Sequence, residues 1–122
     1  IQTQTVHVIV VHLGLLPGSR IRQTQQLHDF IEREVPADAP LLVAGDFNDW
    51  GNAVARMMAT VGLHTNEGRP HPTYPSRLPL VQLDHVYARG MHRVATHVPR
   101  GPIWGRMSDH LPLLVEFAWD AP

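Results

Sequence analysis

Cysteine is absent from the 122-residue sequence, which excludes disulfide bonds, thiolate zinc sites and thiol nucleophiles. Lysine is absent as well, so all ten basic residues are arginines and a phosphate-binding loop that ends in lysine cannot form. The longest apolar runs, such as residues 8–11, are far shorter than the roughly 20 residues of a transmembrane helix. No basic segment followed by an apolar one opens the chain, so we see no signal peptide and expect a cytoplasmic location.

The composition indicates a globular protein with a nearly neutral charge. Hydrophobic residues make up 43% and charged residues 17% of the chain, and the length suits one domain over residues 1–122. Ten basic and eleven acidic residues give a net charge of −1, so the chain lacks the broad basic surface of a nonspecific nucleic-acid binder. The net charge therefore does not support nucleic acid as a substrate, but nucleic acid stays open as one. Nine histidines are many for this length, and histidine serves both as a proton carrier and as a metal ligand.

Hydrophobic periodicity predicts five strands and two helices. The strands are expected at residues 6–13, 41–44, 83–88, 94–98 and 113–118, and the helices at residues 20–35 and 52–60. Ser19 suits the N-cap of the first helix, and Gly45 is expected to end the second strand.

The order of these elements predicts an α/β fold, a mixed β-sheet with helices on one face. The first strand is apolar and β-branched almost throughout, as a buried strand would be. The uncovered face of the sheet would need a cover, from the rest of a larger sandwich or from a second copy of the chain. Two weakly patterned loops, residues 62–80 and 99–107, are where we look for substrate specificity. Arg100 and Arg106 of the second loop are either ligand-binding or simply exposed to solvent.

A carboxylate and a carboxamide follow the second strand. Asp46 and Asn48 are two residues apart, so in extended geometry their side chains point the same way. Together they could hold a hard cation and a phosphate oxygen. The alternative is an ordinary turn, since Asp and Asn favour strand ends. His12 ends the first strand and is either a neighbour of this pair or a packed histidine.

A second candidate site combines acidic residues with histidines near the last strands. Asp109 and His110 precede the final strand, where Asp109 could ligate a metal and His110 could act as a base. The alternative is a turn cap beside a surface histidine. Asp84 lies in an apolar strand and needs a partner, either a histidine that it orients or an arginine. His85 should face the other side of that strand, as a structural histidine.

Taken together, these segments resemble the endonuclease/exonuclease/phosphatase family, which includes DNase I-like nucleases. The resemblance spans nearly the whole chain, and its motifs occur in the family order: residues 12–14 (HLG), 45–48 (GDFN), 83–86 (LDHV) and 108–113 (SDHLPL). Residues 73–77 (TYPSR) leading into residues 83–85 (LDH) look most like uncharacterised bacterial metal-dependent hydrolases.

The resemblance implies half of a four-layer α/β/β/α sandwich. The chain is similar to the C-terminal half of the family domain, and we find no candidate for the Asn and the metal-binding Glu that the N-terminal half supplies. We therefore expect residues 1–122 to be a single domain that forms part of a longer protein, with the N-terminal half absent.

The resemblance further implies that the parent protein is an enzyme that hydrolyses phosphate esters with Mg²⁺ or Mn²⁺. By residue-wise comparison, His110 would be the general base and Asp84 would orient it. Asp46 would position or activate the water, or assist the leaving group. The phosphate ester could be a nucleic acid, a lipid headgroup or a sugar phosphate.

The remaining motif positions are expected to bind phosphate and metal. Asn48 would bind a phosphate oxygen, and His12 would stabilise the charge that develops on phosphorus. Asp109, with Asp46, would hold the metal. Two alternatives stay open: a catalytically incomplete half-domain that forms a homodimer through its open sheet face, and a nuclease acting on DNA or RNA.

Overall fold

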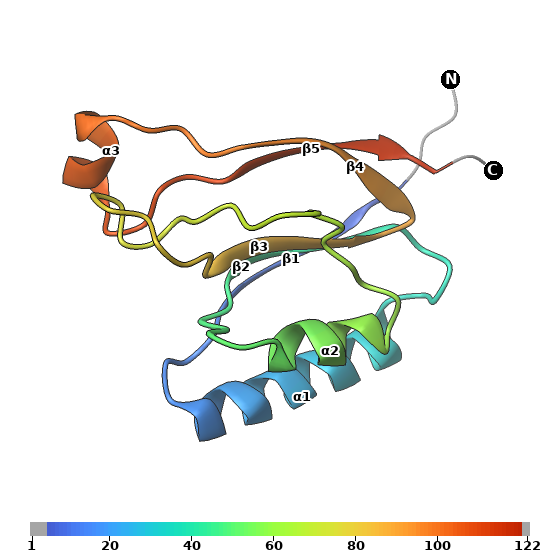
Figure 1. Cartoon of the computed structure of the whole chain (residues 1–122). Helices are drawn as coiled ribbons and strands as arrows, with labels where there is room; N and C mark the ends of the chain where they lie inside the picture. The colour runs from blue at the N-terminus through green and yellow to red at the C-terminus, as the bar shows by residue number, and fades with distance from the viewer. Residues whose placement is uncertain (1–4, 121–122) are drawn as a thin grey trace.

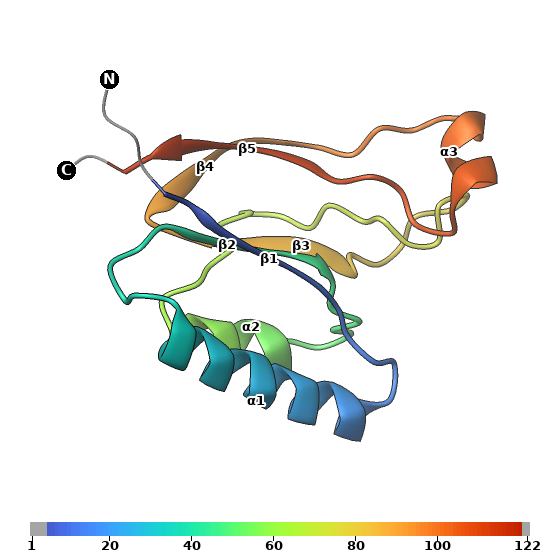
Figure 2. The same ribbon diagram turned by 180° about the vertical axis from the view of Figure 1, so that it is seen from behind.

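The computed structural model describes residues 5–120, in which three layers follow one another (Figure 1). Helices α1 and α2 pack on one side of a three-stranded sheet, and a two-stranded sheet lies beyond it on the side away from these helices, as Figure 2 also shows. In chain order the elements are β1 (His7–His12), α1 (Pro17–Glu34), β2 (Leu41–Asp46), α2 (Ala53–Ala59), β3 (Asp84–Arg89), β4 (Met91–His97), α3 (Pro102–Met107) and β5 (Leu114–Trp119). The five predicted strands and two predicted helices are all present, and the predicted mixed α/β class is confirmed.

The larger sheet positions the site. Its order is β1-β2-β3, with β1 parallel and β3 antiparallel to β2. In this register His12 lies opposite Asp46, and Asp46 lies opposite Asp84. Three predicted site residues therefore share one end of the sheet. The other two strands, β4 and β5, form a separate antiparallel pair with an irregular register between Arg93 and Ala95.

The sequence predicted that Gly45 ends the second strand. In the structure Gly45 instead lies inside β2. Its φ of 145° suits glycine, and a Cβ atom there would lie 1.9 Å from the Val11 carbonyl oxygen of β1. The glycine allows the two backbones to approach closely. This extends the parallel pairing by two residues and brings Asp46 into the strand.

The first helix starts earlier than predicted. It begins at Pro17, and Ser19 lies inside its first turn rather than at the N-cap. Proline suits the first turn because its fixed φ matches the helix and its missing N–H needs no partner there. The N-cap position belongs to Leu16, whose side chain makes no capping hydrogen bond.

The core lies between the helices and one face of the larger sheet. It includes Ile31 of α1, Val43 of β2 and Met58 of α2, each with no exposed surface. The prediction that the first strand is buried holds for one face of β1 only. Its side chains alternate, so that Ile9 and Val11 pack towards the core while Val8 and Val10 on the opposite face are exposed.

The loop predicted at residues 99–107 contains a short helix, α3, which begins at Pro102. The longer loop at residues 62–80 holds no helix or named strand, but it is tied to the fold by isolated bridges. His64 pairs with Ala88 of β3, and Tyr74 pairs with Val81. Among residues 5–120, no helix combines the length and hydropathy that a membrane crossing requires.

Candidate active site

The site forms where the larger sheet meets the segment that leads into β5. The backbone of residues 73–76 binds that segment on both sides of His110. The Ser76 N–H donates to the Asp109 carbonyl oxygen at 2.8 Å, and the Leu111 N–H donates to the Thr73 carbonyl oxygen at 2.7 Å. These hydrogen bonds place His110 over the end of the sheet, beside Asp46 and Asp84.

Asp84 and His110 form a hydrogen-bonded pair. The His110 Nδ1 atom lies 2.7 Å from the Asp84 Oδ2 atom. The sequence left a histidine or an arginine open as the partner of Asp84, and the structure places the histidine there. The Thr73 hydroxyl donates to the same oxygen at 2.6 Å. Thr73 was not predicted as a site residue, although it is the first residue of the TYPSR segment quoted for the resemblance.

The electrostatic surroundings of His110 favour its protonated form. Burial lowers the pKa of the His110 imidazole, but the hydrogen bond to Asp84 and the nearby carboxylates of Asp46 and Asp109 outweigh burial, so the pKa is raised above its usual value. A carboxylate on Nδ1 also fixes the orientation of the ring and leaves Nε2 directed at the site. Such a ring can accept a proton at Nε2 and hold the resulting charge.

Asp46 lies between two histidines. Its Oδ2 atom is 3.5 Å from the Nε2 atom of His12 and 3.5 Å from the Nε2 atom of His110. Its Oδ1 atom accepts a hydrogen bond from the Asn48 backbone N–H at 3.0 Å. The side chain of His12 is 78% exposed, so the alternative of a packed structural histidine does not hold.

The two-residue spacing predicted that Asn48 continues the extended strand of Asp46, but Asn48 does not adopt this geometry. It follows the end of β2 and adopts a left-handed backbone conformation with a φ of 47°. Its Nδ2 atom donates to the Leu13 carbonyl oxygen at 2.6 Å, and the residue is 8% exposed. The side chain thereby fixes the loop after β1, while a second N–H of the amide is left for another acceptor.

An open cleft of about 730 Å³ lies over these groups. It is lined by five of the six predicted site residues, namely His12, Asp46, Asn48, Asp109 and His110. Asp84 is behind His110 and does not line the cleft. Two aromatic rings also form its walls: Trp50 is 54% exposed, and Tyr74 lies 5.0 Å from the His110 ring between centroids. Neither ring was singled out from the sequence, although Tyr74 belongs to the TYPSR segment.

The donor set of the cleft suits a hard divalent cation. Single atoms of Asp46, Asp84 and His110 lie within 4.8 Å of one another, although Asp84 does not line the cleft and its Oδ2 atom is hydrogen-bonded to His110. The exposed Asp109 lines the same cleft but is not part of this close group. No arginine lines the cleft, so its titratable side chains are the carboxylates of Asp46 and Asp109, the two histidines and the phenol of Tyr74. Carboxylate oxygens are the ligands of Mg²⁺ and Mn²⁺, and such an ion would supply the missing positive charge.

His85 takes the structural place predicted for it, outside the cleft. Its Nε2 atom lies 3.1 Å from the Gln82 carbonyl oxygen, and its Nδ1 atom lies 3.6 Å from Glu67. Glu67 also contacts Arg93, whose Nη2 atom is 3.4 Å away. This half-buried group ties the loop at residues 62–80 to strands β3 and β4.

The comparisons with known proteins identify the family of the chain. A model of the Endonuclease/Exonuclease/phosphatase family matches residues 3–110. The chain belongs to this family. The segments on which the sequence resemblance rested come together around the cleft: HLG starts at the last residue of β1, GDFN spans the end of β2, LDHV the start of β3, and SDHLPL leads into β5.

The chain spans only part of the length of the relatives that it matches. It is 36% identical over 118 residues to the uncharacterized protein YbhP of Escherichia coli K12, and this match covers 93% of the chain but 46% of YbhP. A crystal structure of a functionally unknown conserved protein from Enterococcus faecalis V583 matches with a TM-score of 0.78 and 25% identity, covering 93% of this chain and 50% of that one. A structure of D. rerio TDP2 complexed with single strand DNA product matches with a TM-score of 0.60 and 20% identity over 91% of this chain and 55% of that one.

Proposed function

We propose that the protein containing this chain is a metal-dependent phosphoesterase in which His110 is the general base. The observation that carries the proposal is the orientation of the His110 ring. Asp84 holds Nδ1 at 2.7 Å, and Nε2 faces the cleft beside Asp46 at 3.5 Å. A histidine oriented by a carboxylate on its far nitrogen is the arrangement that activates water or a hydroxyl group in many hydrolases.

In the proposed reaction, water attacks the phosphorus atom of the bound ester. The His110 Nε2 atom takes a proton from the water as the new P–O bond forms, and the bond from phosphorus to the leaving oxygen breaks with its electron pair. Asp84 stabilises the imidazolium that results. Thr73, which donates to Asp84 at 2.6 Å, keeps this carboxylate in place. Asp46, next to Nε2, positions the water or assists the leaving group.

His12 and Asn48 are proposed to bind the phosphate. His12 is exposed on the cleft, and its Nε2 atom lies 3.5 Å from Asp46, close to the position of the reacting oxygen. Asn48 is held rigidly by its hydrogen bond to Leu13 and directs its second amide N–H from a nearly buried position. A donor fixed before the substrate arrives stabilises the transition state without further reorganisation.

Asp46 and Asp109 are proposed to hold Mg²⁺ or Mn²⁺. When bound, the ion neutralises negative charge that develops on the phosphoryl oxygens. The proposal is supported by the carboxylates of the cleft and by its lack of an arginine. The absence of arginine makes binding of a phosphate anion by the side chains alone unfavourable.

The exposed face of β1 supports the idea that the family domain continues beyond this chain. Val8 and Val10 are 60% and 77% exposed, although they lie on a central layer of the molecule. The chain also spans only 46% of YbhP. We propose that residues 1–122 form the C-terminal half of the domain and that the other half packs on this face.

The direct test is hydrolysis of bis-p-nitrophenyl phosphate with Mn²⁺ or Mg²⁺. We expect His110→Ala to lower kcat by a factor of about 100 or more, since general bases contribute on that order. His97→Ala, an exposed histidine on β4, serves as the matched control and should keep the wild-type rate. If this chain alone is inactive, the same variants are measured in the longer protein. Undiminished hydrolysis by His110→Ala there would refute the assignment.

Two other functions make different predictions. The apolar face around Val10 favours an inactive half-domain that associates with a second copy of itself. In that case light scattering would give the mass of a dimer. A monomer mass at high protein concentration argues against it. A nuclease would cleave DNA or RNA faster than the small ester. The single strand DNA product seen with TDP2 is the reason to include DNA among the substrates tested.

A further inference from the structure

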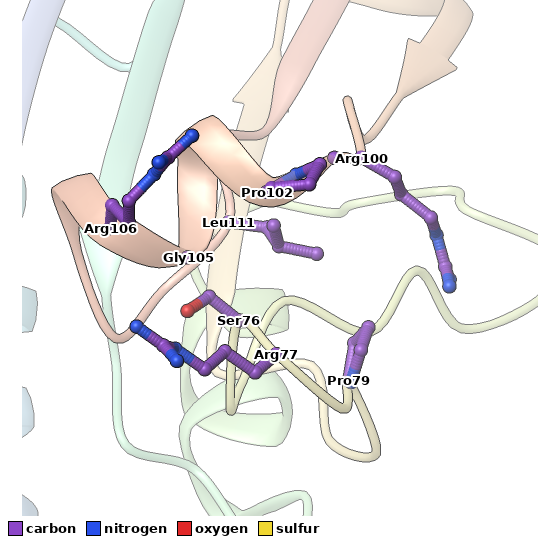
Figure 3. A pocket seen from close by; sticks show the side chains of 9 residues that line it. Ser76, Arg77, Pro79, Arg100, Pro102, Gly105, Arg106 and Leu111 are labelled. Atoms are coloured by element: carbon purple, nitrogen blue, oxygen red, sulfur yellow. The ribbon is translucent and has the colours of Figure 1, made fainter.

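A second pocket, of about 570 Å³, adjoins the cleft and differs from it in charge. Arg77, Arg100 and Arg106 line it, and none of its lining residues is acidic. Figure 3 shows Arg77 and Arg106 on one side of the pocket and Arg100 on the other. Leu111 and Pro102 lie between them.

The three arginines of this pocket have no acidic partner among the described residues. Within residues 5–120, the arginines that form ion pairs are Arg33 and Arg93. In the same part of the chain, the three arginines of this pocket donate no side-chain hydrogen bond, whereas other arginines do. Three uncompensated positive charges around one hollow are notable in a chain whose net charge is −1. Guanidinium groups bind phosphate oxygens through paired hydrogen bonds, so phosphate is the anion that they suit best.

The pocket lies directly across a backbone segment from the catalytic base. His110 lines the cleft, and the next residue, Leu111, lines the pocket. Ser76 of the pocket donates to the carbonyl oxygen of Ser108, a residue that lines the cleft, at 2.7 Å. A ligand with one end in the cleft could therefore pass over exposed Ser108 and Asp109 and reach the arginines.

We propose that this pocket binds a second phosphate group of the substrate, separate from the ester that is cleaved in the cleft. This inference rests on the proposed phosphoesterase activity. The cleft supplies carboxylates for a metal-bound phosphate, and the pocket supplies arginines for a phosphate without metal. The apolar floor formed by Leu111, Pro79 and Pro102 accommodates the organic part that joins the two groups. The second phosphate belongs either to a small bisphosphate or to the next link of a nucleic-acid strand.

The test is equilibrium binding to this chain in low salt with Mg²⁺, which requires no turnover. The probes are thymidine bisphosphate, thymidine monophosphate and a short oligothymidylate without terminal phosphates. We expect at least one of the two probes with several phosphates to bind about tenfold more tightly than the monophosphate, on the scale of a charge-assisted hydrogen bond partly screened by water. Arg100→Ala and Arg106→Ala should remove this gain. Arg56→Ala, on the exposed side of α2, should keep it.

Each outcome decides the proposal. A gain seen with the bisphosphate identifies a small substrate, and a gain seen only with the oligothymidylate identifies a nucleic-acid strand. If neither probe gains over the monophosphate, or if the arginine variants weaken all three equally, the pocket does not bind a second phosphate of the substrate. Failure of the phosphoesterase proposal would appear separately, as absence of metal-dependent hydrolysis of bis-p-nitrophenyl phosphate.

Discussion

At the scale of single residues, one oxygen of Asp84 contacts both His110 and Thr73, so in the proposed function Asp84 is the residue that orients the base. It is half-buried, at the start of β3, and does not line the cleft. Its effect on a substrate must therefore pass through the His110 ring. The two contacts explain why the sequence places an acidic residue in an otherwise apolar strand.

Asp84→Asn is expected to lower the pKa of His110. The carboxylates around the ring raise this pKa by stabilising the imidazolium, so the removal of one negative charge favours the neutral ring. The measurement is an NMR titration of the His110 ring in the metal-free chain. Asp38→Asn, at an exposed loop position, is the control and should leave the titration unchanged. A higher His110 pKa in Asp84→Asn would contradict the account.

Glu67 provides a test of stability against pH. Burial raises its pKa, but the neighbouring His85 imidazole, the hydrogen bond from Gln82 and the charge of Arg93 outweigh burial and lower the pKa below its usual value. A carboxylate with a lowered pKa stabilises the folded state above the pKa of the unfolded chain and loses this contribution as the pH falls through the folded value.

Glu67→Gln is therefore expected to destabilise the chain by about 1–3 kcal/mol at neutral pH, and by less in acid. Denaturant unfolding of both proteins at pH 7 and in acid gives the comparison. Glu116→Gln, at an exposed position of β5, is the control and should stay close to wild type at each pH. A difference between Glu67→Gln and wild type that grows on acidification would show that Glu67 does not stabilise the fold as a carboxylate.

At the scale of elements, the close approach of β1 and β2 is what brings His12 next to Asp46. The pairing continues to His12 and Asp46 only because Gly45 has no side chain at the point where Val11 comes nearest. Loss of this pairing would separate His12 from Asp46 without changing either residue.

Gly45→Ala is expected to destabilise the chain by about 3 kcal/mol or more, because its Cβ atom would overlap the Val11 carbonyl oxygen and its φ is unfavourable for alanine. Thermal or denaturant unfolding measures the effect. Gly51→Ala is the matched control, since a Cβ atom there meets nothing within 4 Å and its φ is not in the left-handed region. Equal stability of the two variants would contradict this reading of β2.

The elements themselves were largely predictable, and so was the meeting of their motifs. Alternating and continuous apolar runs identified the strands, and an acidic residue in an apolar strand required a partner such as His110. Three features were hidden for physical reasons. The role of Gly45 depends on a neighbouring strand, the direction of Asn48 depends on a left-handed backbone, and Thr73 comes from a loop without periodicity.

At the scale of the whole molecule, this chain differs from the complete domain that we propose in that one face of β1 is exposed. Val10 is 77% exposed, so in this chain it contributes little to stability. In the complete domain the same side chain would be covered. The sequence pointed to the loops at residues 62–80 and 99–107 and to Arg100 and Arg106, but not to their meeting with Arg77, because Arg77 is far along the chain from the other two and only folding brings them together.

Val10→Asp is expected to leave the stability of this chain within about 0.5 kcal/mol of wild type, as for other exposed positions. In the longer protein it should cost several kcal/mol, because a buried unpaired charge is strongly destabilising. Ile21→Asp on α1 is the control and should have the same small effect in both proteins. Equal effects of Val10→Asp in the two proteins would show that nothing packs on this face.

The central claim is that His110 takes the proton from the attacking water. The most direct measurement is the kcat of His110→Ala for bis-p-nitrophenyl phosphate in the longer protein, with and without added imidazole. We predict a loss of about 100-fold or more and partial recovery with imidazole, since the free base would occupy the space left by the ring between Asp84 and Asp46. A variant that keeps the wild-type rate would contradict the claim.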